Sequence, residues 1–164
     1  MKLFRSVFTR LAIAAIALSA CGDTLGRSSS DDAAQFVGRW TYLAGSSVVI
    51  NCPGQPPVVT DLSKVPPTNQ PAFFVFSEVS LTRVHEIDAR GCEYDWTIAG
   101  SDAVGVSGQS CDKFPDGRGG ATSVTLVDGV KSTRDGRTMA VAVNFQITQA
   151  ACTAAVRGTA VKTS

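Results

Sequence analysis

The chain of 164 residues has little of what most chemical sites are built from. It contains one histidine, His85, and no two of its cysteines stand in a CxxC spacing. Histidine is the usual base of nucleophilic triads and a common zinc ligand, so its scarcity argues against both kinds of site. GxSxG, HExxH and P-loop patterns are absent as well. The sequence therefore predicts no metal site, no cofactor and no catalytic residue.

An excess of charge of one sign is also lacking. There are 15 basic and 14 acidic residues, and charged residues make up 18% of the chain. Proteins that bind nucleic acid carry a basic stripe or a strong positive charge, so we expect no nucleic-acid partner. The hydrophobic fraction of 44% is too high for a disordered chain. The length suits a single domain.

Long hydrophobic runs are missing except at the N-terminus. Lys2, Arg5 and Arg10 precede the apolar run at 11–20, LAIAAIALSA. A basic start followed by a short apolar run is typical of a secretory signal peptide. The run is too short for a transmembrane helix, which needs roughly 20 apolar residues. Residues 1–20 are therefore predicted to be a signal helix.

The end of this segment, Leu18-Ser19-Ala20-Cys21, resembles the lipobox of bacterial lipoproteins. The resemblance implies that Cys21 becomes the first residue of the mature chain and carries acyl chains such as palmitate. It further implies a membrane partner through this lipid anchor, in the bacterial cell envelope. Stable anchoring needs more than one acyl chain, which a triacylated cysteine provides. Because Gly22 rather than Asp follows the cysteine, the outer membrane is favoured over the inner one.

The mature chain divides into a tether and one folded domain. Loss of residues 1–20 removes three of the 15 basic residues and none of the 14 acids, which leaves twelve basic against fourteen acidic residues. Residues 22–35 are small and polar, so 21–35 are predicted to be the lipidated cysteine and a flexible tether. The β-domain is expected to occupy 36–164.

Within 36–164 the apolar residues recur with a period of two, which predicts strands rather than helices. In the clearest strand Met139, Val141, Val143, Phe145 and Ile147 alternate with small or polar residues. Further strands are expected at 39–43, 47–52, 73–77, 79–87, 92–98, 103–110, around 124–126 and at 153–161.

Turn residues separate these strands. Hairpins are expected at 44–46 and 100–102, and Asp135-Gly136 is a pair suited to a type I′ turn. About eight short strands joined mainly by hairpins predict an all-β fold, an antiparallel meander that is either a closed barrel or a sandwich. Six of the seven prolines fall between Pro53 and Pro71, which predicts a long loop with at most a short edge strand. This loop is either a stiff connector or a lid over one end of the fold.

Four cysteines remain in the mature domain, Cys52, Cys92, Cys111 and Cys152. In an exported domain an even number of cysteines predicts disulfides, here with three connectivities. If 100–103 form a hairpin turn, opposite residues have numbers that sum to 203, and Cys92 faces Cys111. Cys52 and Cys152 then pair by elimination. A turn centred on Gly100 and Ser101 gives a sum of 201 and loses this match.

The start of the domain, Phe36-Val37-Gly38-Arg39-Trp40, resembles the Gly-x-Trp opening of lipocalin-like barrels. The resemblance implies that Trp40 closes one end of a barrel beneath an arginine of the last strand, for which Arg157 is the candidate. The alternative is a glycine turn followed by a core tryptophan.

Three functions remain open. The first is a non-enzymatic domain that binds a small apolar ligand or an envelope component, with Met139, Val141, Val143 and Phe145 facing the ligand. The second is a protein-binding module such as a periplasmic protease inhibitor. The third is a hydrolase built on a carboxylate pair, either Glu86 with Asp88 or Glu93 with Asp95, each on one strand face. Solvated surface charge is the simpler interpretation of those acids and of His85.

Overall fold

The computed structural model describes residues 29–115, 121–148 and 151–164. The predicted signal peptide, Cys21 and the first part of the predicted tether lie outside these residues. Among the residues described, no helix is long and apolar enough to cross a membrane.

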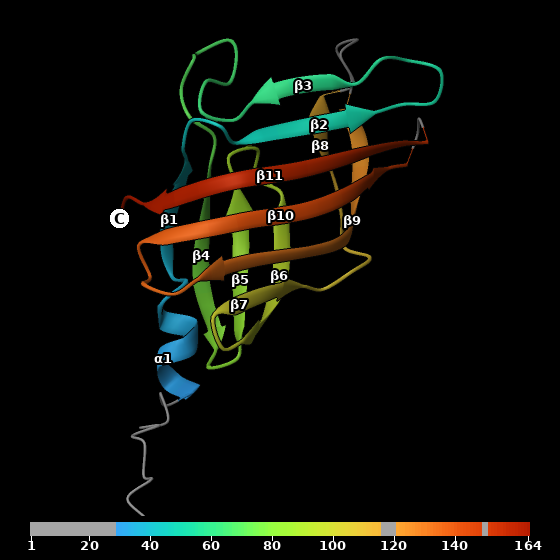
Figure 1. Cartoon of the computed structure of the whole chain (residues 1–164). Helices are drawn as coiled ribbons and strands as arrows, with labels where there is room; N and C mark the ends of the chain where they lie inside the picture. The colour runs from blue at the N-terminus through green and yellow to red at the C-terminus, as the bar shows by residue number, and fades with distance from the viewer. Residues whose placement is uncertain (1–28, 116–120, 149–150) are drawn as a thin grey trace, which may run out of the picture.

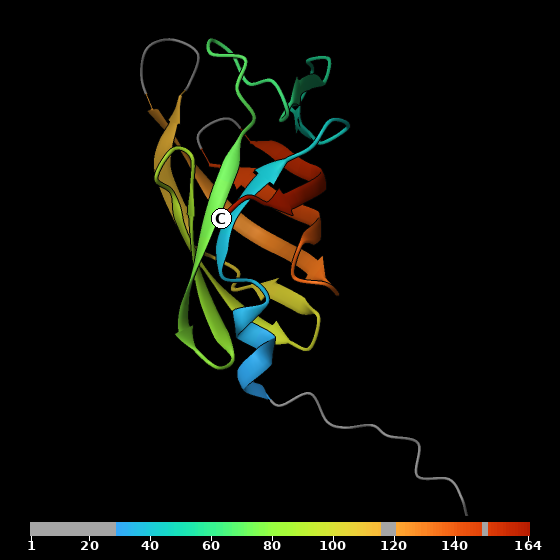
Figure 2. The ribbon, with the colours of Figure 1, turned by 90° about the vertical axis from the view of Figure 1, so that its left-hand side faces the viewer.

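Eight antiparallel strands close into a barrel (Figures 1 and 2). Closure is made by Trp40 in the first strand, which lies opposite Phe74 on one side and Lys162 on the other. The prediction of an all-β antiparallel fold is confirmed, and the barrel rather than the sandwich is the architecture. Around the ring the strands are β1 (Gly38–Tyr42), β4 (Phe73–Ser80), β5 (Arg83–Asp88), β6 (Glu93–Ala99), β7 (Asp102–Gly105), β9 (Ala121–Thr133), β10 (Thr138–Ile147) and β11 (Cys152–Lys162).

Three further strands extend the ring at one end. β2 (Ser47–Asn51) pairs with β11 and with β3 (Val58–Asp61), and β8 (Ser110–Pro115) pairs with β9. β3 is the short edge strand expected within the proline-rich segment. β2 and β3 lie at the end of the barrel opposite the N-terminal helix (Figure 1).

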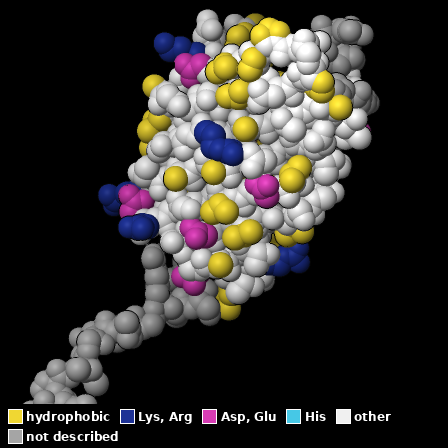
Figure 3. All heavy atoms as spheres, turned by 45° about the vertical axis from the view of Figure 1, so that its right-hand side comes forward, with side chains coloured by type: hydrophobic (Ala, Val, Ile, Leu, Met, Phe, Trp, Pro, Cys, Tyr) yellow, Lys and Arg dark blue, Asp and Glu magenta, His cyan; other side chains and the backbone are white. Residues whose placement is uncertain are grey.

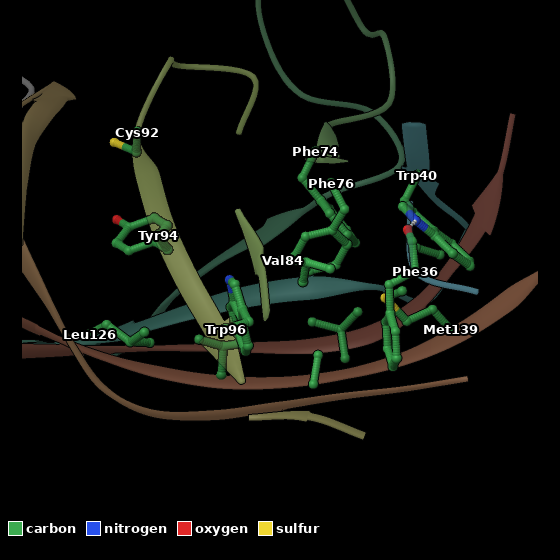
Figure 4. Packing of buried hydrophobic residues seen from close by; sticks show 14 of the residues in the cluster. Phe36, Trp40, Phe74, Phe76, Val84, Cys92, Tyr94, Trp96, Leu126 and Met139 are labelled. Atoms are coloured by element: carbon green, nitrogen blue, oxygen red, sulfur yellow. Dashed lines mark hydrogen bonds between the residues drawn. The ribbon is translucent and has the colours of Figure 1, made fainter. Parts of the chain in front are cut away.

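The alternation along the strands places the core inside the barrel. On β10 the side chains of Met139, Val141 and Val143 are buried, whereas Ala140 and Ala142 between them are exposed. On β6 the aromatic rings of Tyr94 and Trp96 point inward from the same face (Figure 4). The period-two pattern of these strands is therefore confirmed.

The predicted strand at 79–87 is wrong, because β4 ends at Ser80 and β5 begins at Arg83. The hairpin turns at Leu81-Thr82, which contains none of the glycine, proline, asparagine or aspartate residues that usually mark turns. The predicted strand at 103–110 is also two strands, β7 and β8, which pair with different parts of β9.

The predicted hairpin at 44–46 is wrong too. β1 and β2 run in the same direction, one after the other along β11. At the break between them, the Ser46 hydroxyl accepts a hydrogen bond from the Thr159 amide and donates one to the Thr159 carbonyl. This side chain replaces the missing ladder bonds, and Gly158 leaves room for it, because a Cβ there would overlap Ser46.

The β9–β10 hairpin exists but lacks the predicted type I′ turn. Such a turn needs positive φ at both central residues, and Gly136 has it at 64° while Asp135 does not. Instead, Asp135 Oδ1 accepts hydrogen bonds from the amides of Arg137 and Thr138.

A short helix, α1 (Ser29–Ala34), begins the described chain and lies against the lower end of the barrel (Figures 1 and 2). The prediction of a flexible tether is wrong for this part. Ala33 and Phe36 are fully buried, and Gln35 Nε2 donates to the Gly100 carbonyl at 2.9 Å. Three contacts with the barrel thus hold a segment whose sequence is too short and polar to show a helical period.

Candidate functional site

The interior of the barrel has two unlike halves. Toward α1 it is filled, because Phe36, Trp40 and Met139 lie together there with less than 1% of their surface exposed (Figure 4). The rings of Phe36 and Phe76 meet edge to face at 6.2 Å, and Phe76 meets Trp96 in the same way at 6.1 Å. This half is a packed core.

Toward the β2–β3 hairpin the interior contains a cavity of about 210 Å³. Its rim includes Arg90, whose guanidinium carbon lies 4.7 Å from the centre of the Phe114 ring. A cavity of about 150 Å³ in a protein core is enough to hold benzene. The aromatic and aliphatic lining residues are Tyr42, Val48, Ile50, Leu62, Ala72, Phe73, Phe74, Ala89, Tyr94, Trp96, Phe114, Val124, Val143, Phe145, Ile147, Ala154 and Val156.

The four residues predicted to face a ligand divide between these two halves. Val143 and Phe145 line the cavity. Met139 and Val141 are buried in the core cluster and do not contribute to the lining, and Met139 lies beside Phe36 in the packed half (Figure 4). Two of the four thus line the cavity, and their contact with a ligand stays a prediction.

A buried ion pair forms part of the cavity wall. Lys131 Nζ of β9 lies 2.6 Å from Glu86 Oε2 of β5, and their side chains are only 2% and 6% exposed. Nζ also lies 3.5 Å from the centre of the Phe74 ring and 4.8 Å from that of Trp96. Aromatic faces attract cations, so the ammonium is held by a carboxylate and by rings.

Burial sets the acid–base properties of this pair. It raises the pKa of Glu86 against the opposing effect of Lys131. It lowers the pKa of Lys131 against the opposing effect of Glu86. Each partner therefore offsets the cost of burying the other's charge, and neither would remain charged as readily alone.

Two tyrosines complete the polar part of the cavity. Burial, with added repulsion from Glu86 and Asp88, raises the pKa of both Tyr42 and Tyr94, so both phenols are neutral hydrogen-bond donors. The Tyr94 hydroxyl is buried and has no hydrogen-bond partner among the described residues. A buried hydroxyl without a partner is unusual and costly.

Sequence reasoning missed Lys131 because a β-bulge reverses the alternation of β9. Val124 and Leu126 point inward, and a strict period of two would then turn Lys131 outward. The register shifts beside Val127, where Phe145 pairs with Leu126 and Asn144 pairs with Asp128. After this extra residue Gly129 and Lys131 face the interior.

The Gly-x-Trp segment places Trp40 in the packed half of the barrel, and the cation beside its ring is not the predicted one. Trp40 is fully buried, and its indole N–H donates to the Phe36 carbonyl at 2.6 Å. Lys162 of the last strand, rather than Arg157, lies over the Trp40 ring at 5.1 Å.

Arg157 is exposed and binds the Asn144 side chain and the Val143 carbonyl on the outside of the barrel. The barrel-closing role predicted for Arg157 is therefore wrong. Arg157 lines a groove of about 410 Å³ on the outside of the barrel. The groove is a surface feature with exposed walls such as Val104 and Val130.

Gly38 has a structural reason to be glycine. Its φ is 126°, a conformation that side chains disfavour, and an added Cβ would collide with the carbonyl oxygen of Ser164.

The disulfides are Cys92–Cys111 and Cys52–Cys152, as predicted. The register used to predict the first of them is wrong, because Ala99 lies opposite Asp102 and the numbers sum to 201. The disulfide forms outside that ladder, because β7 ends at Gly105 and residues 106–109 lead into β8, which pairs with β9. There Gln109 bridges the gap through its side chain, which bonds to both the amide and the carbonyl of Asp95.

The candidate carboxylate pairs lie on different sides of the barrel wall. Glu86 and Asp88 line the cavity, so solvated surface charge is the wrong interpretation for Glu86. Glu93 and Asp95 lie on the outside, both beside His85, whose Nδ1 is 2.9 Å from Asp95 Oδ1. Within the described ranges no three metal-ligating side chains gather into a site.

Comparison with known proteins does not extend this description. No family model, no curated protein and no solved structure matches the chain.

Proposed function

We propose that this chain is a lipid-anchored lipoprotein of the bacterial cell envelope whose barrel binds a small, mainly apolar ligand without changing it chemically. The observation that carries the proposal is the aromatic and aliphatic cavity of about 210 Å³ inside an otherwise packed barrel. Ligand sites are typically concave, mostly apolar and equipped with a few polar groups, and this cavity has each of those properties.

Lipid anchoring rests on the lipobox-like Leu18-Ser19-Ala20-Cys21 and on the signal-like run before it. Two disulfides are in keeping with an oxidising compartment outside the cytoplasm. Since α1 and β2–β3 lie at opposite ends, a chain anchored through Cys21 would hold the cavity end away from the lipid (Figure 1). Gly22 after the cysteine supports the outer membrane as its location. A Cys21→Ser variant should leave the membrane fraction after washing, and its retention there would contradict the anchor.

Cavity binding is tested with a variant that fills the space. Ala154 lines the cavity and Ala140 is exposed on the outer face of β10, so Ala154→Phe and Ala140→Phe form a matched pair. Calorimetric titration with a small aromatic compound should show binding to the native protein and to Ala140→Phe, and loss of binding in Ala154→Phe. Equal binding by both variants would place the ligand outside the barrel.

A protein-binding module is the second candidate, favoured by two exposed apolar residues on the edge strand. Val58 and Val59 of β3 are 58% and 64% exposed. An unpaired strand edge with exposed valines can accept a strand of another chain. On the face in Figure 3 basic and acidic side chains lie next to one another in small groups, so no patch of one sign there selects a partner. Native mass spectrometry of protein purified from its own host separates the candidates, since one predicts a small added mass and the other a second chain.

A further inference from the structure

The position of Lys131 in the cavity wall bears on the chemistry of the ligand. An ammonium has three N–H donors, and Glu86 Oε2 is the one oxygen of the described residues within ion-pair distance of Nζ. The other near neighbours are the rings of Phe74 and Trp96, which attract a cation but accept no conventional hydrogen bond. Lys131 therefore has N–H donors that Glu86 does not use, and its side chain lies in the wall of the cavity.

The Tyr94 hydroxyl adds a second donor of the same kind. It is buried, has no partner among the described residues, and belongs to a side chain that lines the same cavity. The indole N–H of Trp96, which also lines the cavity, is likewise buried and without a partner in the described part of the chain. These two groups and the N–H donors of Lys131 that Glu86 does not use favour a ligand that brings an acceptor, because an unmade buried hydrogen bond is costly.

Charge limits what that acceptor can be. Glu86 already neutralises Lys131, and Asp88 of the lining offsets Arg90 at the rim, so a ligand carboxylate beside Lys131 would leave an excess negative charge in the interior. Burial of an unpaired charge is strongly unfavourable. A neutral oxygen can take a hydrogen bond from the ammonium and leave the pair balanced.

We propose that the ligand is a small apolar compound with a neutral carbonyl oxygen, and that this oxygen accepts a hydrogen bond from Lys131 Nζ. The proposal rests on the proposed function of the cavity and narrows it to aldehydes, ketones and esters rather than hydrocarbons or fatty acids. The volume of about 210 Å³ suits a substituted benzene ring.

Three probes of matched shape test this. Acetophenone carries a carbonyl, α-methylstyrene replaces its oxygen with CH₂, and benzoate replaces the acetyl group with a carboxylate. Calorimetry should show that the native protein binds acetophenone at least as tightly as α-methylstyrene and about tenfold or more tighter than benzoate. In native protein labelled with ¹³C-lysine, acetophenone should shift the Cε resonance of Lys131, with exposed Lys64 as the internal reference.

The matched variant is Glu86→Met/Lys131→Met, which removes both charges and keeps the side-chain lengths similar. It should lose about tenfold or more in affinity for acetophenone, since a hydrogen bond to a charged donor is lost, and change less than about threefold for α-methylstyrene. An unchanged ratio of the two affinities would overturn the proposal. So would a native protein that prefers α-methylstyrene tenfold or prefers benzoate, and these two results do not depend on the variant folding. If α-methylstyrene binds in the cavity and is preferred tenfold over acetophenone, the carbonyl is wrong and the proposed function stands. If no probe binds, both fail.

Discussion

Replacement of Lys131 by methionine should destabilise the barrel far more than an ordinary lysine substitution. The change keeps the length of the side chain but leaves the Glu86 carboxylate, 6% exposed, without its partner 2.6 Å away. Loss of one partner of a buried ion pair typically costs about 3–5 kcal/mol of unfolding free energy. Removal of both partners, in Glu86→Met/Lys131→Met, should cost much less, because no charge is left buried.

The unfolding free energy of Lys131→Met should depend on pH, and the direction of this dependence follows from the pKa of Glu86. In Lys131→Met the two effects of lysine that lower the pKa of Glu86 disappear, whereas burial and Asp88 still raise it. The folded variant then keeps a proton that the unfolded chain, with a pKa of about 4.3, releases. Its stability should be greatest near pH 4 and should fall as pH rises toward the raised pKa, by up to about 1.4 kcal/mol per pH unit.

Urea unfolding between pH 4 and pH 8 measures both effects, with Lys64→Met as the control because Lys64 is exposed. We expect a large loss at pH 7 for Lys131→Met that shrinks toward pH 4, and no such slope in the double variant or the control. A loss below about 1 kcal/mol with no dependence on pH would show that Lys131 does not face Glu86 inside the barrel. This result would also contradict the inward position of Lys131 after the β9 bulge and the proposed hydrogen bond from Lys131 to a ligand.

Three further predictions concern the rest of the barrel. Replacement of Cys52 and Cys152 by serine should lower the unfolding free energy by about 4.7 kcal/mol, because this disulfide closes a loop of 100 residues. Replacement of Cys92 and Cys111 should lower it by about 3 kcal/mol, because their loop spans 19 residues. Guanidinium titration measures both losses, and the reverse order would contradict the chain-entropy argument. Lys162→Met should cost about 1 kcal/mol in urea unfolding through loss of its contacts with the Trp40 ring and the Gln35 carbonyl, and Arg157→Met should cost less. Gly38→Ala should lower the melting temperature more than Gly108→Ala, since both glycines have positive φ but only Gly38 meets a backbone oxygen; equal shifts would argue against the contact with Ser164.

Strands could be predicted from the sequence where inward-facing and outward-facing residues alternate without interruption along the whole strand. On β10, residues from Met139 to Val143 alternate without interruption, so their buried face follows directly from the period of two. The cysteine pairs could be predicted because the even count in an exported domain leaves few connectivities. For Cys92 and Cys111 the predicted pair is correct, but the predicted β6–β7 register differs from the one in the structure.

The ion pair in the cavity wall could not be predicted, because the inward position of Lys131 depends on one extra residue in β9. The bulge beside Val127 inverts the faces of β9, and no residue type in that stretch marks the position. The turn at Leu81-Thr82 and the break between β1 and β2 were missed for a similar reason. Pairing partners far away in the chain set these irregularities, and local sequence patterns carry little sign of them.

β11 is shared between the barrel and the β2–β3 hairpin, since its residues 153–157 bond to β2 and residues 160–162 bond to β1. Amide hydrogen exchange should therefore show two levels of protection along this one strand. The hairpin can release the first segment by local opening at the Ser46 break while the second keeps the ring closed. Because Cys52–Cys152 ties the far end of β2 to the start of β11, the width of that opening is set by the disulfide. Reduction should accelerate exchange at 153–157 first, so the redox state of the compartment would govern how readily the cavity admits the proposed ligand.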